Sequence, residues 1–485
     1  MHGGLRTGAA VPCVVRRLLL PAILALVAMA AGTLAVGSVP EPSGSPFAVV
    51  GPPTAAPVLT VRRVPVALAA PIGERRIRDG ITALVAGLPQ PSCVAVSEGE
   101  RLLFEAGPDV PVVPASTLKL VTAAAVLTHV DASETLRTTV VTGAPLSDGV
   151  LAGDLWFVGA GDPVLGTQAY GDTFERQPTL QTSMEVLADR IVASGIRSVQ
   201  GRVVGDETRY DTVRYIPTWP DRYRQTDEIG PLSALSVNDG FATFGRGSEP
   251  FPDPPTGAAG VLTELLRARG VEVLGEPGAG ATPPAAVTEV AGIDSPPVLE
   301  LVGQMLRESD NGTAELLLKE VGARVAGEGS TAAGAAVAEA TLAELGLALA
   351  GVDVVDGSGL DRGNRVTCRL LLGLLQEVDA GGEVEGGLAV AGVTGTLARR
   401  FLDTPVSGRL RAKTGALNNI AALAGYADTR NDGELTFAFV LNGLELRADP
   451  GPAQSTLAEL LVSYPDAPAL DELGPSAWPG LVPAP

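Results

Sequence analysis

The stretch Pro114-Ala115-Ser116-Thr117-Leu118-Lys119 places a serine three residues before a lysine, at the start of an apolar run. Lys and Arg together number 35 in this chain of 485 residues, yet only Lys119, Lys319 and Lys413 are lysines. Arginine stays protonated at any accessible pH, whereas a buried lysine near another cation can lose its proton and act as a base. Lys119 and Lys413 are therefore candidates for lysine chemistry. Lys319 lies in a predicted helix beside Glu320 and is interpreted as a structural or surface residue.

Ser116 and Lys119 begin a predicted helix that continues through the apolar residues Leu120–Leu127. The i, i+3 spacing puts the two side chains on one helix face, within reach of each other. A serine hydroxyl becomes a good nucleophile when a base takes its proton, and a neutral lysine can do this without histidine. The first turn also directs backbone amides at a reacting carbonyl, which suits an oxyanion. The alternative is a capping serine beside a surface lysine, since Ser-x-x-Lys is common by chance.

Histidine is nearly absent, because the chain holds only His2 and His129. His129 follows the apolar run, and we interpret it as a cation near a helix C-terminus. A Ser-His-Asp triad or a zinc site would have to rest on this residue, and no Gly-x-Ser-x-Gly sequence occurs. We expect a serine enzyme here to use a base other than histidine, and we expect no metal or cofactor.

Two further triplets carry polar groups that suit the same chemistry. Lys413-Thr414-Gly415 lies in a predicted strand, where the lysine supplies positive charge, the threonine can bind a carboxylate and the glycine admits substrate backbone. Ser309-x-Asn311 lies between two predicted helices, with a hydroxyl that could relay a proton and an amide that could hold a peptide group. Each triplet is weak alone, but the three in this order form a strong pattern.

Composition limits the class of protein. The chain is 46% hydrophobic and 19% charged, which predicts a packed core, and its length predicts more than one compact unit. Its formal net charge of −20 argues against nucleic acid as a partner.

The N-terminal segment predicts export. Arg6, Arg16 and Arg17 precede an apolar run from Leu18 to Gly37, and no acidic residue occurs before Glu41. Residues 1–37 are therefore a secretory signal peptide or an uncleaved N-terminal membrane anchor. Residues 38–71, rich in Pro, Gly, Ala and Val, are expected to be a flexible linker, and 464–485 a disordered tail.

Periodicity predicts the remaining elements. We expect helices over 72–88, 184–194, 297–307, 313–326, 329–345, 367–378 and 453–463, and strands over 92–96, 102–105, 153–158, 201–206, 409–415, 421–427 and 435–441. Pro and Gly mark loops over 248–256 and 275–284. Gly159-Ala160-Gly161 follows a strand, but Pro163 stands where a phosphate-binding helix would open, so we predict a tight turn and not a nucleotide site.

With these motifs in place, the sequence resembles the D-alanyl-D-alanine carboxypeptidase/endopeptidase family, the class C low-molecular-mass penicillin-binding proteins, over roughly residues 75 to 463. Further stretches are similar to family landmarks, namely Gly159–Pro163, Gly201–Asp206, Ser309–Asn311, Asp356–Leu360 and Ala421–Tyr426. The resemblance implies an α+β fold, a transpeptidase/β-lactamase-like domain with a five-stranded antiparallel sheet and helices. It further implies a mainly β inserted domain over 131–294, between catalytic parts 72–130 and 295–463.

The resemblance also implies roles for individual residues. Ser116 would be the acylated nucleophile and Lys119 the general base, while Ser309 and Lys413 would handle the proton to the leaving group. Substrate-binding positions would be Asn311, Thr414, Gly415 and Ala416, with the backbone amides of Ser116 and Ala416 forming the oxyanion hole.

The sequence departs from the family pattern in two respects. Ala416 stands where the family usually has threonine, so one hydroxyl contact to a substrate carboxylate is missing. The insertion looks shorter than the usual one, and we expect its smaller inner module to be reduced or absent. Cys93 and Cys368 would both lie in the catalytic domain of an exported protein, either as a disulfide or as two separately buried thiols.

The function implied is that of a serine DD-peptidase of the cell envelope, which hydrolyses D-Ala-D-Ala termini or cross-links of peptidoglycan stem peptides through an acyl-enzyme. Its partners would be these stem peptides and β-lactam antibiotics as covalent inhibitors. Two alternatives stay open from the sequence. One is a β-lactamase of the same fold, and the other is an envelope binding or scaffold protein with weak chemistry.

Overall fold

The computed structural model describes residues 64–177, 179–245, 247–283, 287–378, 382–445 and 449–466. The predicted leader, most of the predicted linker and residues 467–485 lie outside them. Residues 64–130 and 295–466 are called the main part, and residues 131–294 the insertion.

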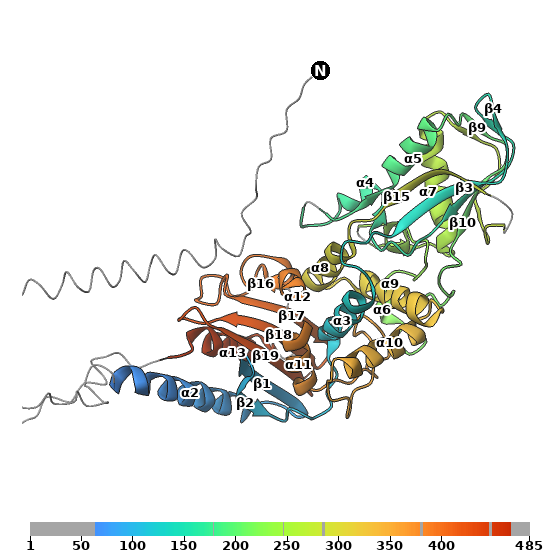
Figure 1. Cartoon of the computed structure of the whole chain (residues 1–485). Helices are drawn as coiled ribbons and strands as arrows, with labels where there is room; N and C mark the ends of the chain where they lie inside the picture. The colour runs from blue at the N-terminus through green and yellow to red at the C-terminus, as the bar shows by residue number, and fades with distance from the viewer. Residues whose placement is uncertain are drawn as a thin grey trace, which may run out of the picture. The chain divides into compact units, whose positions relative to one another are not determined.

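The main part is built on one antiparallel sheet in the order β16-β17-β18-β19-β1-β2 (Figure 1). Five of its strands are long and were predicted, and the sixth, β16, has only two residues. Their bounds are β1 Ser92–Glu98, β2 Arg101–Ala106, β16 Ala389–Val390, β17 Leu410–Leu417, β18 Ile420–Asp428 and β19 Glu434–Asn442. The predicted five-stranded antiparallel sheet is thus confirmed.

Helices cover both faces of this sheet. Their bounds are α2 Val64–Val85, η1 Ala115–Leu118, α3 Lys119–His129, α8 Val298–Glu308, α9 Asn311–Val321 with a π-helical extension Gly322–Ala326, α10 Thr331–Glu344, α11 Cys368–Val378, α12 Glu383–Gly387, η4 Gly395–Leu397 and α13 Gly451–Ser463. α2 and α13 pack on one face, while α11 packs on the other and α3, α8, α9 and α10 follow behind it.

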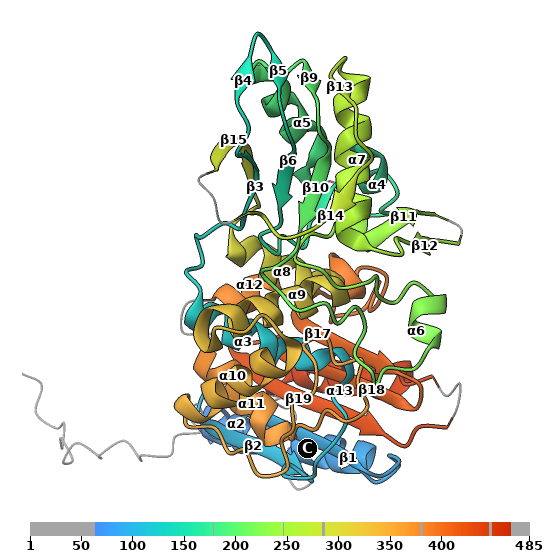
Figure 2. The same cartoon turned by 90° about the vertical axis from the view of Figure 1, so that its right-hand side faces the viewer.

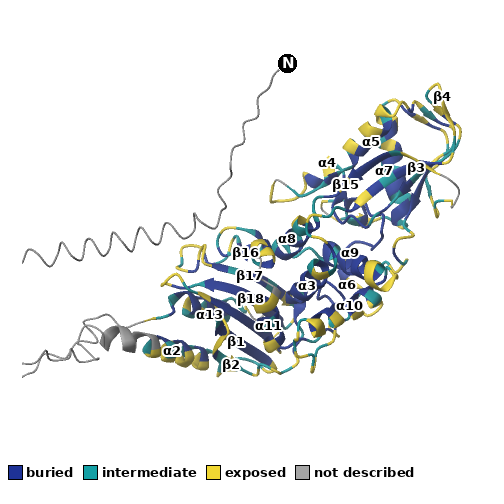
Figure 3. Cartoon of the chain, viewed as in Figure 1, coloured by how far each residue is buried: buried dark blue, intermediate teal, exposed yellow. Residues whose placement is uncertain are grey.

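The strand sequences show why the sheet has two buried faces. Along β18, Ala421 and Leu423 join the core with α2 and α13, whereas Ala422 and Ala424 join the core with α3 and α11. Side chains of a strand alternate between the faces, so a strand covered on both sides is apolar throughout. Figure 3 shows these central strands as buried.

Helix α3 lies inside the second core. Its residues from Lys119 to Val126 are all buried, and it contacts α8, α9, α10 and α11. A helix that is apolar all round is stable when other elements surround it. This burial places Lys119, at the first position of α3, away from water.

The insertion forms a second α/β unit. Its main sheet has the order β14-β10-β6-β3-β15, with α5 and α7 on one face (Figure 2). The bounds are β3 Arg137–Thr142, β4 Leu146–Ser147, β5 Val150–Leu151, β6 Leu155–Val158, β7 Leu165–Gly166, α4 Gln168–Gly171, β8 Thr182–Ser183, α5 Met184–Ala193, β9 Ser198–Val199, β10 Val203–Asp206, α6 Arg222–Gln225, η2 Asn238–Gly240, β11 Phe241–Thr243, β12 Glu249–Pro250, α7 Pro254–Ala268, β13 Glu272–Val273, β14 Gly278–Ala279 and β15 Thr288–Asp294. Its first and last long strands, β3 and β15, pair with each other.

The insertion carries helices as well as strands, and part of its strand pairing is parallel. β10 pairs in parallel with both β6 and β14. The predicted loop over 248–256 was wrong at its end, because α7 begins at Pro254. Proline lacks an N–H that the first helical turn leaves unpaired in any case, so the prolines at 254 and 255 begin this helix well.

Two boundaries of the main part also differ from prediction. α2 begins at Val64, inside the predicted linker, because Ala and Leu are good helix formers and Pro65 lies in the first turn. At the other end, Tyr464 belongs to the folded part and not to the tail. It is buried against the core, and its hydroxyl accepts a hydrogen bond from Arg101.

Candidate functional site

Ser116 is the one half-buried residue of the buried turn η1. Ala115, Thr117 and Leu118 of η1 are buried, while Ser116 is half-buried. Ala115 has a φ of 48°, in the left-handed region that non-glycine residues rarely adopt. Such strain persists where the surrounding structure holds it, and it is common at active sites. The turn thereby presents the Ser116 hydroxyl on the surface of a rigid core.

Lys119 is fully buried, and its ammonium group has three acceptors. Nζ lies 3.1 Å from Ser116 Oγ, 2.8 Å from Asn311 Oδ1 and 2.6 Å from the carbonyl oxygen of Ser358. Burial lowers the pKa of Lys119 to about 8, and the negative charges of Asp356 and Glu315 oppose that shift. A lysine with this pKa is neutral in a useful fraction of molecules near neutral pH.

Lys413 lies on β17, the strand that packs against η1. It is buried, and its Nζ donates a hydrogen bond of 2.9 Å to the carbonyl oxygen of Thr414. Burial, aided by the charge of Lys119, moves the pKa of Lys413 well below its usual value. The two lysines therefore share one electrostatic site.

Gly415 allows β17 to approach the serine turn closely. A Cβ atom at this position would lie 2.8 Å from the Pro114 carbonyl oxygen and 3.2 Å from the Ser116 nitrogen. Beyond Ala412, β17 pairs only with β18 among the described residues, so its other edge faces the site. An extended peptide could add to that edge as a further strand.

Thr414 and Ala416 stand near Gly415 on the same strand. The hydroxyl groups of Thr414 and Thr396 are hydrogen-bonded at 2.9 Å. The Ala416 side chain is exposed and offers no hydrogen-bonding atom. Position 416, where the sequence lacks the threonine usual in the family, is thus on the surface and has room for a larger side chain.

Ser309 and Asn311 come from the junction between α8 and α9. Ser309 ends α8 with a φ of 65°, and Asp310 caps α9 by accepting a hydrogen bond of 3.0 Å from the Thr313 amide. Asn311 then begins α9, and its Nδ2 donates to the carbonyl oxygen of Glu228, 2.8 Å away in the insertion. The structure thus brings Asn311 to Lys119, and the insertion reaches the edge of the site.

Two buried carboxylates beneath Lys119 were missed by the sequence reasoning. Glu315 Oε1 accepts hydrogen bonds from the backbone amides of Gly357 and Ser358, at 3.0 and 2.7 Å. Burial raises the pKa of Glu315 to about 8. It lies four residues after Asn311 on α9, so helical spacing alone could have placed it on the face that carries Asn311.

Asp356 is the second carboxylate, and it begins the stretch Asp356–Leu360, a landmark to which the sequence assigns no role. Its oxygens accept four hydrogen bonds, from Trp219 Nε1, Asn364 Nδ2 and the amides of Gly359 and Asp361. Burial raises the pKa of Asp356, and these donors oppose that shift.

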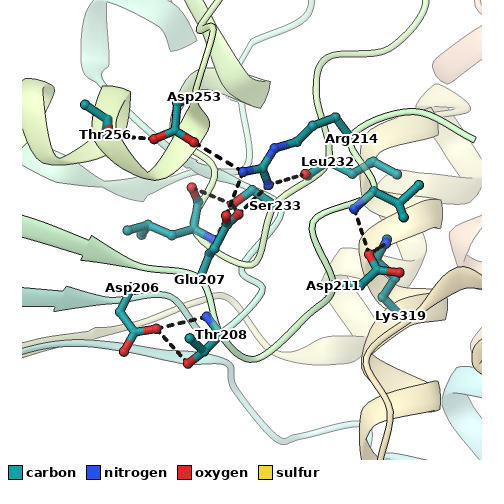
Figure 4. A network of polar contacts seen from close by, with 12 residues as sticks. Asp206, Glu207, Thr208, Asp211, Arg214, Leu232, Ser233, Asp253, Thr256 and Lys319 are labelled. Carbon is teal, nitrogen blue, oxygen red and sulfur yellow. Dashed lines mark hydrogen bonds and ion pairs between the residues drawn. The ribbon is translucent and has the colours of Figure 1, made fainter. Parts of the chain in front are cut away.

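The third lysine, Lys319, is structural and not on the surface. It is buried on α9 and forms an ion pair with Asp211 of the insertion, as Figure 4 shows. In the same region Arg209 and Tyr210 bind Glu320. These contacts attach the insertion to the helix that carries Asn311. His129 ends α3, with its Nε2 2.9 Å from Thr341 Oγ1.

Cys93 and Cys368 form a disulfide bond in the structure, with their Cα atoms 5.8 Å apart. The bond links β1 to the start of α11. No group of three or more His, Cys, Asp or Glu residues suited to a metal ion occurs within the described ranges.

A cavity of about 1080 Å³ adjoins the site. The insertion lines it with residues 170, 174–177, 179, 180 and 227–232, and the main part with residues from the stretches 304–312 and 393–399. Ser309 and Asn311 lie on its wall. The cavity is therefore continuous with the polar groups that surround Lys119.

Comparisons with known proteins find relatives that cover most of the chain. The D-Ala-D-Ala carboxypeptidase 3 (S13) family matches residues 92–245 and 251–463. The chain is 32% identical to carboxypeptidase DacB of Mycolicibacterium smegmatis, over 82% of this chain and 86% of the relative. It is 29% identical to the D-alanyl-D-alanine carboxypeptidase of Actinomadura sp. (strain R39), over 76% and 80%.

Among solved structures, the fold is similar to that of penicillin binding protein 4 (dacB) from Haemophilus influenzae. The TM-score is 0.67 at 19% identity, over 78% of this chain and 97% of that one. With a family match across most of the described residues, the chain belongs to the D-Ala-D-Ala carboxypeptidase 3 (S13) family of serine peptidases.

Proposed function

We propose that Ser116 is the nucleophile of a DD-peptidase and that Lys119 is its general base. The observation that carries this proposal is the 3.1 Å contact between Lys119 Nζ and Ser116 Oγ, made by a buried lysine. With a pKa of about 8, roughly a tenth of Lys119 is neutral at pH 7. That fraction can accept the serine proton.

In the acylation step, Ser116 Oγ attacks the carbonyl carbon of the penultimate D-alanine while its proton passes to Lys119. The backbone amides of Ser116 and Ala416 stabilise the oxyanion. The carbon–nitrogen bond then breaks, and the proton held by Lys119 passes through Ser309 and Lys413 to the leaving amine, which leaves Lys119 neutral. Water hydrolyses the resulting ester, with Lys119 again as base, and restores the Ser116 hydroxyl.

The motif residues would also supply the substrate contacts. The unpaired edge of β17 would bind the peptide backbone at Gly415, Asn311 would bind a peptide group, and Thr414 would bind the terminal carboxylate. The low pKa of Lys413 comes from burial beside another lysine, which suits a group that gives and takes protons.

The substrates we propose are peptidoglycan stem peptides outside the cytoplasm, with β-lactams as covalent inhibitors. The solved relative is named as a penicillin binding protein, which supports the second point. Export would depend on residues 1–37, as a signal peptide or an anchor. Among the described helices, none is long and apolar enough to cross a membrane.

The acylation claim is tested by incubating the protein with a fluorescent penicillin. We expect one stable covalent label that is absent from the Ser116→Ala variant. A covalent label on the Ser116→Ala variant would show that Ser116 is not the nucleophile. The β-lactamase alternative predicts rapid turnover of the antibiotic instead of a stable adduct. The scaffold alternative predicts that the protein binds a D-Ala-D-Ala peptide and releases no D-alanine.

A further inference from the structure

Glu315 is a buried carboxyl group of the site that the proposed acylation steps do not use. It lies on α9, one helical turn after Asn311. We propose that Glu315 is a positioning residue, which orients the base Lys119 through the Gly357-Ser358 peptide and does so as an uncharged carboxylic acid. This inference rests on the proposed function and deepens it, because it names the residue that sets the direction in which the base accepts the serine proton.

The lone pair of Lys119 carries the first step. An uncharged lysine amine has two N–H bonds and one lone pair, and three oxygens surround Nζ in the structure. Asn311 Oδ1 at 2.8 Å and the Ser358 carbonyl oxygen at 2.6 Å can only accept, so they take the two N–H bonds. The lone pair is then left for the Ser116 hydroxyl at 3.1 Å. The direction of the base therefore depends on where these two acceptors are held.

Glu315 holds the Ser358 carbonyl group in place through the backbone beside it. Its Oε1 accepts hydrogen bonds from the amides of Gly357 and Ser358, at 3.0 and 2.7 Å. Thr122 of α3 donates to the Gly357 carbonyl oxygen at 2.7 Å, and a Cβ atom at Gly357 would lie 2.6 Å from the Ala314 carbonyl oxygen. Without an acceptor at position 315, two buried amides lose their partner and the peptide can turn its carbonyl group away from the lysine.

The two buried carboxyl groups of the site differ in their hydrogen-bond donors. Asp356 accepts four hydrogen bonds, which favour its charged form. Glu315 accepts two, both at Oε1, and its buried Oε2 has no hydrogen-bond partner among the described residues. A buried charge without donors costs far more free energy than an uncharged hydroxyl group. The pair therefore keeps its negative charge on Asp356 and its proton on Glu315 Oε2.

The surrounding charges agree with an uncharged Glu315. Burial raises its pKa to about 8, aided by the negative charge of Asp356, so roughly nine tenths of Glu315 is protonated at pH 7. A second ionised carboxylate would raise the pKa of Lys119 further and keep it an ammonium ion, which cannot accept a proton. The other titratable groups that act on Lys119 are Asp310, Glu228 and, on β17, Lys413.

Infrared spectroscopy tests the proton on Glu315. A protonated carboxylic acid has a C=O band that ionised carboxylates lack, and we expect wild type at pH 7 to lose such a band in Glu315→Gln. Glu320→Gln is the matched control, since Glu320 is also buried on α9. Burial alone would raise the pKa of Glu320, but its hydrogen bonds with Arg209 and Arg324 lower it. This control should keep the band. An acid band that is unchanged in Glu315→Gln would overturn the uncharged state.

The rate of acylation by a fluorescent penicillin tests the positioning. The labelled fraction counts folded molecules, and the rate constant reports the orientation of the base, so the two are scored separately. Glu315→Leu removes the acceptor, and we expect its rate constant to fall about tenfold or more. Glu315→Gln keeps an uncharged acceptor and should recover most of this loss. It should also lower the pH midpoint of acylation less than Asp356→Asn does, because it removes no charge at neutral pH.

The positioning role is wrong if the Glu315→Leu protein is acylated at the wild-type rate, or if Glu315→Gln is slowed by about tenfold or more. The glutamine variant decides alone if the leucine variant does not fold. A midpoint that falls in Glu315→Gln as far as in Asp356→Asn would show a charged Glu315 and contradict the inference. Absence of penicillin labelling in wild type would instead overturn the proposed function, and the positioning role with it, while the infrared band would still report the proton on Glu315.

Discussion

The indole nitrogen of Trp219 donates a hydrogen bond of 2.8 Å to Asp356 Oδ2. Trp219 belongs to the insertion, whereas Asp356 belongs to the main part. Among the negative charges that raise the pKa of Lys119, that of Asp356 has the largest effect. The insertion therefore helps to hold the electrostatic surroundings of the proposed base. Both residues are buried, so the bond is shielded from water.

Trp219→Phe keeps the ring and removes the N–H donor. We expect the free energy of unfolding to fall by about 1–2 kcal/mol, because one acceptor position of a buried carboxylate loses its donor. Urea titration of the protein measures this change. Trp156→Phe is the matched control, since no hydrogen bond of its indole is present among the described residues, and it should cost less than Trp219→Phe. Equal losses in the two variants would contradict the role of the Trp219 donor.

Much of the fold could be predicted from the sequence because its signals are local. The alternating apolar strands and the amphipathic helices identified the sheet and its covering helices. The motifs placed Ser116 and Lys119 at the start of a helix and Lys413 on a strand. The start of α7 was missed because paired prolines usually mark loops, although they also suit the first turn of a helix.

The buried carboxylates of the site could not be predicted, because tertiary contacts bring them together. Asp356 and Glu315 lie 41 residues apart in sequence, and Glu315 accepts hydrogen bonds from the two residues that follow Asp356. No spacing rule connects a helix to such a loop. The sequence likewise leaves Lys319 as either structural or surface-exposed, and only its pairing with Asp211 decides that it is structural.

The pH dependence of acylation should report Lys119. Its neutral form is the active base, so the rate of penicillin acylation should rise with pH through about 8 and then level. Lys119→Arg should lose this rise and fall about 10²-fold or more in rate, because the guanidinium stays protonated. Stopped-flow labelling between pH 6 and 10 measures both. A wild-type rate that is flat across this range would contradict Lys119 as the base.

Asp356→Asn tests the charge beneath Lys119. The ionised carboxylate raises the pKa of Lys119, so its removal should move the acylation profile to lower pH. In asparagine an NH2 group replaces one carboxylate oxygen and cannot accept the two hydrogen bonds that Oδ2 accepts from Trp219 and Asp361. We therefore also expect a stability loss of about 2–4 kcal/mol. Asp353→Asn, an exposed change in the same loop, should leave both quantities unchanged. A profile that moves to higher pH would contradict the electrostatic assignment.

The Cys93–Cys368 bond closes a loop with a sequence separation of 275 residues. Cross-links over long loops reduce the entropy of the unfolded chain, and native disulfides commonly contribute about 2–5 kcal/mol. The double variant Cys93→Ala, Cys368→Ala should therefore unfold at lower urea concentration. At low temperature it should still react with penicillin, since neither cysteine is among the residues that we place in the site. Reductant should lower the stability of wild type and leave that of the double variant unchanged. A wild-type stability that does not change with reductant would contradict the presence of the bond in solution.

Ala416→Thr should improve the enzyme on substrates with a terminal carboxylate. Position 416 is exposed on the edge strand, so a threonine side chain fits there, and β-branched residues suit strands. Its hydroxyl would add one hydrogen bond to a charged group, worth about 1.5 kcal/mol, which corresponds to roughly a tenfold rise in kcat/KM for D-alanine release. Ala416→Val has the same shape without the hydroxyl and should show no gain. If both variants gain equally, packing and not carboxylate recognition is responsible, and if neither gains, Thr414 and its neighbours already satisfy the carboxylate.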